Sequence, residues 1–211
     1  MLIRKFLEED VPAAGQMAYD TWSYELDGVG HDLNRFIHEY LVRYYDTNRQ
    51  YSFSVVDQSL NAFLLAGFKT DSPGCSGWFE NTLSRFSAEE KTVALEYRDY
   101  LSRNGNAVKK YMQDTDIMMG LFISNGGGTG RRLLTDFEEL CRRNAVENIY
   151  LWADVTCHYS WYEKNGFQIM ERFENKTSVD IGLLDTYIFR KNLNQAEHVE
   201  TTAKLSMFSC N

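Results

Sequence analysis

A surplus of basic side chains is absent from this sequence. Its 211 residues include 22 Lys and Arg against 30 Asp and Glu, which gives a net charge of −8 at pH 7. Nucleic acids and anionic membrane surfaces both attract a basic face, so this balance argues against either as a partner. Apolar runs long enough to span a bilayer or to begin a signal peptide are also absent. We therefore expect a cytoplasmic protein without a nucleic-acid or membrane partner.

Paired cysteines are missing as well. The four cysteines, Cys75, Cys141, Cys157 and Cys210, form no CxxC pair and no spacing typical of zinc sites. We expect reduced thiols, as in a cytosolic protein, and no bound metal. Internal repeats are absent, and the length suits one domain. The expected division is a domain over residues 1–193 and a polar C-terminal tail over 194–211.

A glycine cluster stands out among the features that are present. The stretch from Leu121 to Leu134 reads Leu-Phe-Ile-Ser-Asn-Gly-Gly-Gly-Thr-Gly-Arg-Arg-Leu-Leu, an apolar run, then glycines, then a helical pattern. Glycine lets the backbone approach a ligand closely, and the first turn of a helix offers unpaired N–H groups at its positive end. This arrangement predicts a site for a phosphate or pyrophosphate.

Two common phosphate-binding motifs do not match the cluster. A Walker loop needs Gly-Lys-Ser/Thr, but Gly130 is followed by two arginines, with no hydroxyl for a magnesium ion. The dinucleotide fingerprint needs a further glycine three residues after Gly130, where Leu133 stands. An ordinary nucleotide-binding domain remains a minor alternative, one in which ATP or NAD would stabilise the chain and coenzyme A would not.

Hydrophobic periodicity and capping signals predict alternating helices and strands. Asp10 before Val11-Pro12 is expected to cap the first helix, and Ser87 with Glu90 forms a capping box that begins a helix ending near Ser102. The other expected helices cover residues 31–45, 129–144 and 158–165. The expected strands cover residues 2–6, 51–56, 62–68, 117–123, 149–155, 167–173 and 185–190.

Two segments together resemble a known family. Asn125-Gly-Gly-Gly-Thr-Gly130 resembles the pyrophosphate-binding Gln/Arg-x-x-Gly-x-Gly/Ala loop of the GCN5-related N-acetyltransferases, and Ser160-Trp-Tyr-Glu-Lys-Asn-Gly-Phe167 resembles that family's aromatic-Tyr-Glu-Lys-x-Gly-Phe segment. The resemblance covers Leu2 to about Leu193. It implies an α+β fold, with a central mixed, mostly antiparallel sheet flanked by helices. A helical insertion would cover about residues 71–111, before the fourth strand.

The resemblance also implies a function and a cofactor site. It points to an acetyl-CoA-dependent N-acetyltransferase that moves an acetyl group to a primary amine by direct attack in a ternary complex. The alternative is a non-catalytic acyl-CoA-binding or regulatory protein of the same fold. Two features depart from the family. Asn125 replaces the usual Gln or Arg in a loop about three residues shorter, and Val155 stands where the family often has Asn, seven residues before the tyrosine. The expected cofactor-binding residues are Leu121, Phe122, Ile123, Asn125, Gly126, Gly127, Gly128, Thr129, Gly130 and Arg131.

The catalytic and acceptor residues follow from the same resemblance. Tyr162 is expected to donate a hydrogen bond to the departing sulfur. Three residues are candidates for the general base that takes the proton of the amine: Asp154, Asp116 and Glu80. Asp154 is the preferred candidate. The acceptor would be a small-molecule or peptide amine, and the insertion is a place for acceptor specificity or for a homodimer contact. The expected acceptor-site residues are Trp22, Tyr24, His31 and Glu80.

Overall fold

The computed structural model describes residues 1–26, 28–176 and 183–194. In that part of the chain, seven strands form one sheet in the order β1-β2-β3-β4-β5-β7-β6. Each neighbouring pair is antiparallel except β4 and β5, which are parallel. This confirms the mixed, mostly antiparallel sheet. The strands are β1 Leu2–Lys5, β2 Phe53–Asp57, β3 Ser59–Phe68, β4 Ile117–Ser124, β5 Asn148–Asp154, β6 Gln168–Lys176 and β7 Leu183–Asn192.

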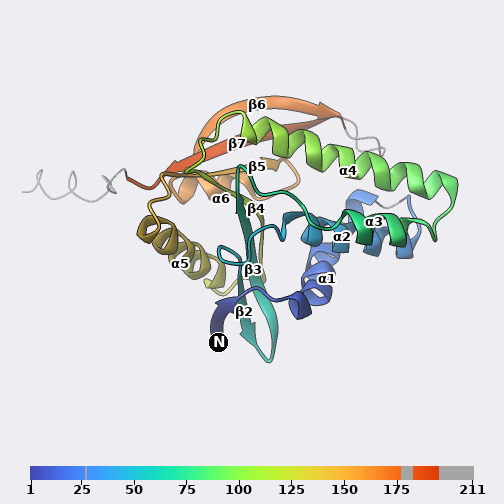
Figure 1. Ribbon diagram of the computed structural model, residues 1–211, viewed down its shortest axis with the longest axis horizontal. Helices are drawn as coiled ribbons and strands as arrows, with labels where there is room; N and C mark the ends of the chain where they lie inside the picture. The colour runs from blue at the N-terminus through green and yellow to red at the C-terminus, as the bar shows by residue number, and fades with distance from the viewer. Residues whose placement is uncertain (27, 177–182, 195–211) are drawn as a thin grey trace, which may run out of the picture.

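Helices cover both faces of the sheet (Figure 1). Alternation along β3 explains the two layers, because Phe63 and Leu65 join the core under α1 and α2, while Leu64 joins the core under α5. The helices are α1 Val11–Trp22, α2 His31–Tyr45, α3 Ser76–Leu83, α4 Ala88–Lys109, α5 Thr129–Arg143 and α6 Tyr159–Lys164, with short 3-10 turns η1 Glu8–Asp10 and η2 Ser23–Leu26. No helix among these residues is long and apolar enough to cross a membrane.

Strands β4 and β5 separate soon after they begin. Their pairing is confined to Ile117 with Ile149 and Met118 with Tyr150. Across the other edge of β4, Met119 pairs with Ala66 and Leu121 with Leu65, so Gly120 is an extra residue in a β-bulge. A side chain at Gly120 would meet the Tyr45 ring, whose Cδ1 lies 2.1 Å from an added Cβ. The bulge and the separation open a wedge between the two central strands.

The insertion before β4 is helical, as expected, but its elements differ from the expected ones. α3 was not predicted, and α4 does not end at Ser102 but runs on through Asn104 and Gly105 to Lys109. Tertiary contacts explain the continuation, because the fully buried Asn104 side chain accepts a 2.6 Å hydrogen bond from Asn175 of β6. This partner on a distant strand outweighs the low helix propensity of Asn and Gly.

Asp10 has a different role from the expected helix cap. It makes no side-chain capping bond to α1. Its carboxylate instead accepts two 2.6 Å hydrogen bonds from Arg4, one of 2.7 Å from Ser54 and one from the Leu7 N–H. Asp10 therefore joins β1 and β2 to the turn before α1. The expected polar tail lies outside the described residues, apart from Asn194.

Candidate active site

The glycine loop joins β4 to α5 at the open end of the wedge. Gly126, Gly127 and Gly128 all have positive φ, at 93°, 63° and 77°, a region that side chains rarely allow. An added Cβ at Gly126 or Gly128 would meet nothing within 4 Å, so the space above the loop is free. α5 begins directly afterwards, and its first i−4 hydrogen bond runs from Arg132 to Gly128.

Gly130 serves packing rather than backbone conformation. A Cβ there would lie 3.1 Å from Ser124 Cβ and 3.2 Å from Phe122 Cζ. The start of α5 therefore rests directly on β4, and the N–H groups of its first turn face the region around the loop. With Arg131 beside them, these amides make a positive site suited to a phosphate group.

A groove of ≈ 870 Å³ extends from this loop along β4 to α6. Trp161 of α6 packs against Phe122 of β4 with ring centroids 5.5 Å apart, which holds the two sides of the groove together. Of the expected cofactor-binding residues, Gly127 and Thr129 do not line the groove, and Leu121 lines the adjoining inner cavity instead. Those that line the groove are Phe122, Ile123, Asn125, Gly126, Gly128, Gly130 and Arg131.

An inner cavity of ≈ 80 Å³ lies deeper in the wedge. Its walls come from α1, η2, α2, α4, β4 and β5, and it includes the bulge residue Gly120. The cavity adjoins the groove because five residues line both: Trp22, Phe122, Thr156, Cys157 and Tyr162. A bound molecule in the groove and a second one in the cavity would therefore meet at this junction.

Tyr162, the expected donor to the leaving sulfur, lines both spaces and so stands at their junction. Its ring packs at 5.7 Å from Phe167 and 5.6 Å from Phe189. Burial, and then the nearby Cys157, raise the pKa of its phenol well above the ordinary value. The hydroxyl thus keeps its proton at neutral pH and can donate a hydrogen bond.

Asp154 ends β5 and lines the inner cavity, but its carboxylate is already occupied. It accepts a 2.7 Å hydrogen bond from the Tyr100 hydroxyl, one of 3.0 Å from the Thr156 N–H, and one from the Thr156 hydroxyl. The side chain is 4% exposed. These hydrogen bonds hold the carboxylate in place, which suits it to positioning its neighbours.

Glu25 of η2 is the carboxylate that the sequence analysis missed. It lines the inner cavity, and its Oε1 is buried without a hydrogen-bond partner among the described residues. Burial raises its pKa to about 7; a hydrogen bond with Thr156 opposes this shift and the charge of Asp154 adds to it. The hydroxyl of Thr156 has one proton, so it serves either Asp154 or Glu25 at a time. Nothing in the local sequence marks Glu25, because its burial depends on α4 and β5.

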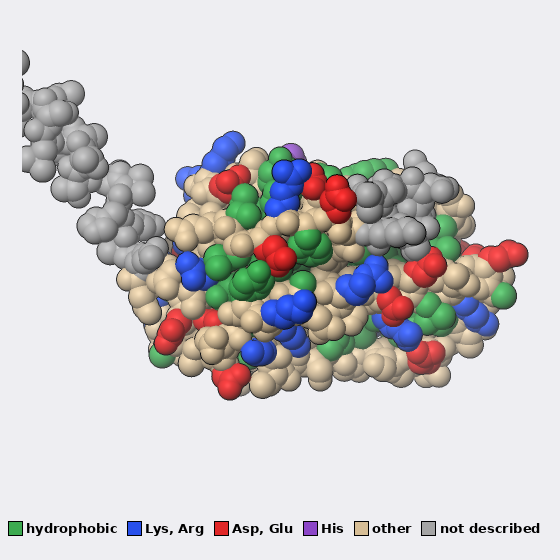
Figure 2. Space-filling view, turned by 90° about the horizontal axis from the view of Figure 1, so that it is seen from above, with side chains coloured by type: hydrophobic (Ala, Val, Ile, Leu, Met, Phe, Trp, Pro, Cys, Tyr) green, Lys and Arg blue, Asp and Glu red, His purple; other side chains and the backbone are tan. Residues whose placement is uncertain are grey.

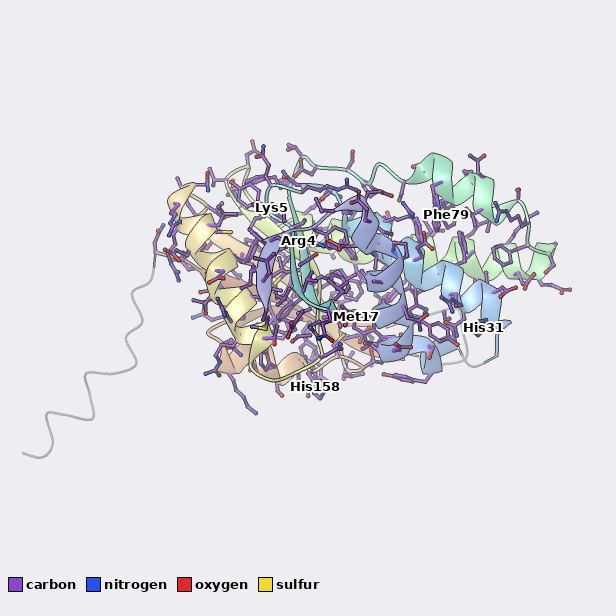
Figure 3. All side chains as sticks on the ribbon, turned by 90° about the horizontal axis from the view of Figure 1, so that it is seen from below. Arg4, Lys5, Met17, His31, Phe79 and His158 are labelled. Atoms are coloured by element: carbon purple, nitrogen blue, oxygen red, sulfur yellow. The ribbon has the colours of Figure 1, made fainter. Side chains whose placement is uncertain are left out.

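The expected acceptor-site residues divide into two groups. Trp22 lines both spaces and Tyr24 lines the groove. His31 is exposed, lies 5.6 Å from the Tyr19 ring and lines neither space; Figure 3 shows it far from His158, which lines the groove. Glu80 of α3 is an exposed partner of Arg98 at 3.0 Å and also lies outside both spaces. The third base candidate, Asp116, is buried at the start of β4 and accepts hydrogen bonds from Asn148 and the Gln113 N–H.

Other chemistries find little support in the site. Burial, and then the charge of Asp154, raise the pKa of the Cys157 thiol far above its ordinary value, so it is no thiolate nucleophile. Within the described ranges, no group of three or more His, Cys, Asp or Glu side chains could hold a metal ion.

Comparison with solved structures identifies the fold. No protein-family model matches the sequence, and no curated protein does so. Arylalkylamine N-acetyltransferase 2 from Aedes aegypti is 14% identical, with a TM-score of 0.56 over 92% of this chain and 99% of its own. Ribosomal-protein-alanine N-acetyltransferase from Brucella melitensis is 16% identical, with a TM-score of 0.53 over 91% and 99%. Naa20 from Chaetomium thermophilum, solved with a bisubstrate analogue, is 14% identical, with a TM-score of 0.52 over 91% and 86%. The chain has the fold of the GCN5-related N-acetyltransferases.

Proposed function

We propose that the protein is an acetyl-CoA-dependent N-acetyltransferase that transfers an acetyl group directly to a primary amine in a ternary complex. One observation carries the proposal: the groove beside the glycine loop and the inner cavity meet at Phe122, Cys157 and Tyr162. Direct transfer needs two substrates to reach one another without bulk water between them. The fold of the neighbours, several of which are named N-acetyltransferases, supports the same assignment.

Several features of the groove support coenzyme A as its ligand. The open space above Gly126 and Gly128, and the amides at the start of α5, suit the pyrophosphate, with Arg131 adding positive charge. Pairing with β5 stops at Met118, so the edge of β4 from Leu121 to Ile123 that faces the wedge is open to an extended chain. Its backbone N–H and C=O groups suit the amides of the pantetheine arm. When bound, acetyl-CoA supplies the acetyl group as a reactive thioester.

Glu25 is the residue best placed to remove the proton from the acceptor. An alkylamine near pKa 10 is mostly an ammonium ion at neutral pH and must lose a proton before it can attack. A carboxylate with a pKa of about 7 is partly ionised at that pH and is a stronger base than an ordinary glutamate. Glu25 takes the first proton from the ammonium ion, and the free amine then forms the C–N bond as the C–S bond breaks. The second N–H proton passes to the departing thiolate, so coenzyme A leaves as a thiol.

Tyr162, which lines both spaces, is the proposed donor to the leaving sulfur. Its phenol is a weaker acid than a thiol, so transfer of the whole proton would be uphill. A hydrogen bond from the hydroxyl to the developing thiolate stabilises the same charge without that cost. Asp154 positions this region through its bond to Thr156, which lines both spaces.

The test is coenzyme A release from acetyl-CoA, measured with and without a panel of primary amines. We expect release to depend on the amine and a mass increase of one acetyl group on the amine. A melting temperature that rises with coenzyme A but not with ATP or NAD would support the groove assignment. Coenzyme A binding with no transfer to any amine would instead indicate a non-catalytic acyl-CoA-binding protein.

A further inference from the structure

The inner cavity is walled off by the helix of the insertion. α4 contributes Tyr97, Tyr100 and Leu101 to its lining, on the side away from the groove. Leu101 is fully buried. The opposite walls come from Met119 of β4 and Trp152 of β5. In Figure 1, α4 runs along the top of the sheet beside β6 and β7, so a long substrate would meet this helix.

This wall is fixed by hydrogen bonds and ring contacts. The Tyr100 hydroxyl donates to Asp154 at 2.7 Å, and the Tyr100 ring lies 5.5 Å from Trp152, edge to face. The Trp152 Nε1–H in turn donates to the Tyr45 hydroxyl at 2.9 Å. Tyr100, Trp152 and Tyr45 are thus linked to one another by these contacts. Because each ring has a partner, the cavity keeps its size without a bound ligand.

The cavity carries negative charge and no positive charge. Glu25 and Asp154 line it, and no Lys, Arg or His is among the described residues that do so. The faces of aromatic rings such as Trp22 and Tyr97 also attract cations. A monocation is therefore favoured, whereas a carboxylate, as in an amino acid, finds no partner and would be repelled.

The volume limits the body of the ligand. The cavity measures ≈ 80 Å³. An engineered cavity that binds benzene is about 150 Å³, roughly twice as large. The space beyond the junction with the groove, bounded by α4, thus suits an amine with a short apolar group and is too small for the backbone and side chains of a peptide.

From these observations we propose that the acceptor is a compact, apolar primary monoamine, whose ammonium group lies beside Glu25 and whose carbon chain lies against Tyr97 and Leu101. This inference rests on the proposed acetyl transfer and narrows its substrate class. Amino acids are excluded by their carboxylate, and polyamines and polypeptide N-termini are excluded by their size.

The test compares kcat/KM for propylamine, butylamine, octylamine, β-alanine, spermidine and an alanine-terminated tripeptide. We expect propylamine or butylamine to exceed β-alanine, spermidine and the tripeptide by about 100-fold or more, since β-alanine brings a carboxylate beside Glu25 and Asp154 and the other two exceed the size of the cavity. A preference for the tripeptide, for spermidine or for β-alanine overturns the inference while leaving acetyl transfer in place.

Enlarging the cavity should change the preferred amine. Leu101→Ala is expected to raise the octylamine-to-butylamine ratio of kcat/KM by about tenfold, because each methylene in an apolar pocket alters discrimination by roughly 10-fold or more. Val93→Ala is the control, since Val93 lies on the same helix but does not line the cavity. If Leu101→Ala does not fold, Tyr97→Ala, at a half-buried position, tests the same wall. Equal ratios in the folded wall variant and the control overturn the inference.

A binding measurement separates this inference from the proposed reaction. Trp22 and Trp152 line the cavity, so butylamine should change their fluorescence on binding even in the absence of turnover. Transfer that fails for every amine, together with saturable butylamine binding, contradicts the proposed reaction but not the cavity assignment. Absence of butylamine binding, with or without coenzyme A, overturns the assignment itself.

Discussion

At the scale of single residues, Glu25, the proposed base, shows how burial changes an ordinary carboxyl group. The carboxylate lines the inner cavity with Oε1 lacking a partner among the described residues, while the neighbouring Asp154 accepts bonds from Tyr100 and Thr156. The two carboxylates in one cavity thus differ: Glu25 has an unpartnered oxygen and is the proposed base, and Asp154 is held in place by its hydrogen bonds.

Glu25→Gln should lower kcat by about 10²–10⁴-fold, the usual contribution of a general base. The wild-type rate should rise with pH through about 7 as Glu25 ionises, and this rise should disappear in the variant. The measurement is a pH–rate profile with butylamine. Glu96→Gln, an exposed position on α4, is the control. An unchanged profile in Glu25→Gln would remove the residue from the mechanism.

The same substitution should stabilise the protein at alkaline pH. The folded pKa of Glu25 lies above its unfolded value, so the wild type loses stability as pH rises from about 4.5 towards 7 and does not regain it. We expect Glu25→Gln to gain on the order of 1–3 kcal/mol at pH 8 and little at pH 4. Urea unfolding at both pH values measures this gain. An equal change in unfolding free energy at the two pH values would be inconsistent with a carboxyl group whose pKa is raised by burial.

Tyr162→Phe tests the hydrogen bond to the leaving group. The ring packs against Phe167 and Phe189, contacts that phenylalanine keeps, so thermal stability should change little. We expect kcat to fall by roughly 10–100-fold with KM nearly constant, because the bond strengthens only as the sulfur gains charge. Tyr159→Phe on the same helix is the control, since its ring stacks on Tyr187 at 4.8 Å and lines neither space. Unchanged turnover at saturating substrate would exclude the role.

At the scale of secondary-structure elements, the wedge between β4 and β5 depends on the bulge at Gly120. Gly120→Ala places a Cβ 2.1 Å from the Tyr45 ring, so we expect a loss of about 1–3 kcal/mol in unfolding free energy, as for other overpacked cores. Gly77→Ala is the control, because an added Cβ on α3 meets nothing within 4 Å. Chemical unfolding measures the unfolding free energy of both variants. Equal stabilities would show that the Tyr45 ring moves aside without cost.

The sequence predicts the elements well where local signals decide them. The 129–144 helix after the glycines and the 31–45 helix match α5 and α2 closely, since both have strong apolar stripes. Local signals fail where contacts between residues distant in the sequence determine the structure. Asn175 holds Asn104 inside α4. Arg4 and Ser54 bind the Asp10 carboxylate, which therefore does not cap α1.

The residues of the candidate site show the same difference between local signals and distant contacts. The loop from Asn125 to Arg131 and the position of Tyr162 are readable because they belong to contiguous motifs. Glu25 and Tyr100 are not, because their role arises only where η2, α4 and β5 meet. His31 and Glu80 were expected at the acceptor site, and neither lines the groove or the inner cavity.

At the scale of the whole molecule, charge is dispersed on the face shown in Figure 2, where Lys and Arg side chains alternate with Asp and Glu. This agrees with a net charge of −8 and with a ligand recognised inside the molecule.

Acid stability depends on buried pairs. Burial alone would raise the pKa of Asp10, but hydrogen bonds from Arg4, Ser54 and Leu7 outweigh it and lower the pKa.

Asp10→Asn should therefore weaken the protein at neutral pH and alter its acid response. A lowered folded pKa gives stability that is present above the unfolded pKa, near 4, and is lost as pH falls below it. We expect a loss of about 1.5–3 kcal/mol at pH 7, typical of hydrogen bonds to a charged group, and a smaller difference at pH 3. Unfolding at the two pH values measures this. A difference that does not shrink in acid would contradict the pairing with Arg4.

The most direct test is the initial rate of coenzyme A release from acetyl-CoA, measured with increasing butylamine at pH 8. If the groove and the inner cavity hold two substrates that meet at Tyr162, the rate rises with butylamine to saturation and N-acetylbutylamine forms in equal amount. A rate that does not depend on butylamine or on any other amine, in a protein that binds coenzyme A, would contradict acetyl transfer.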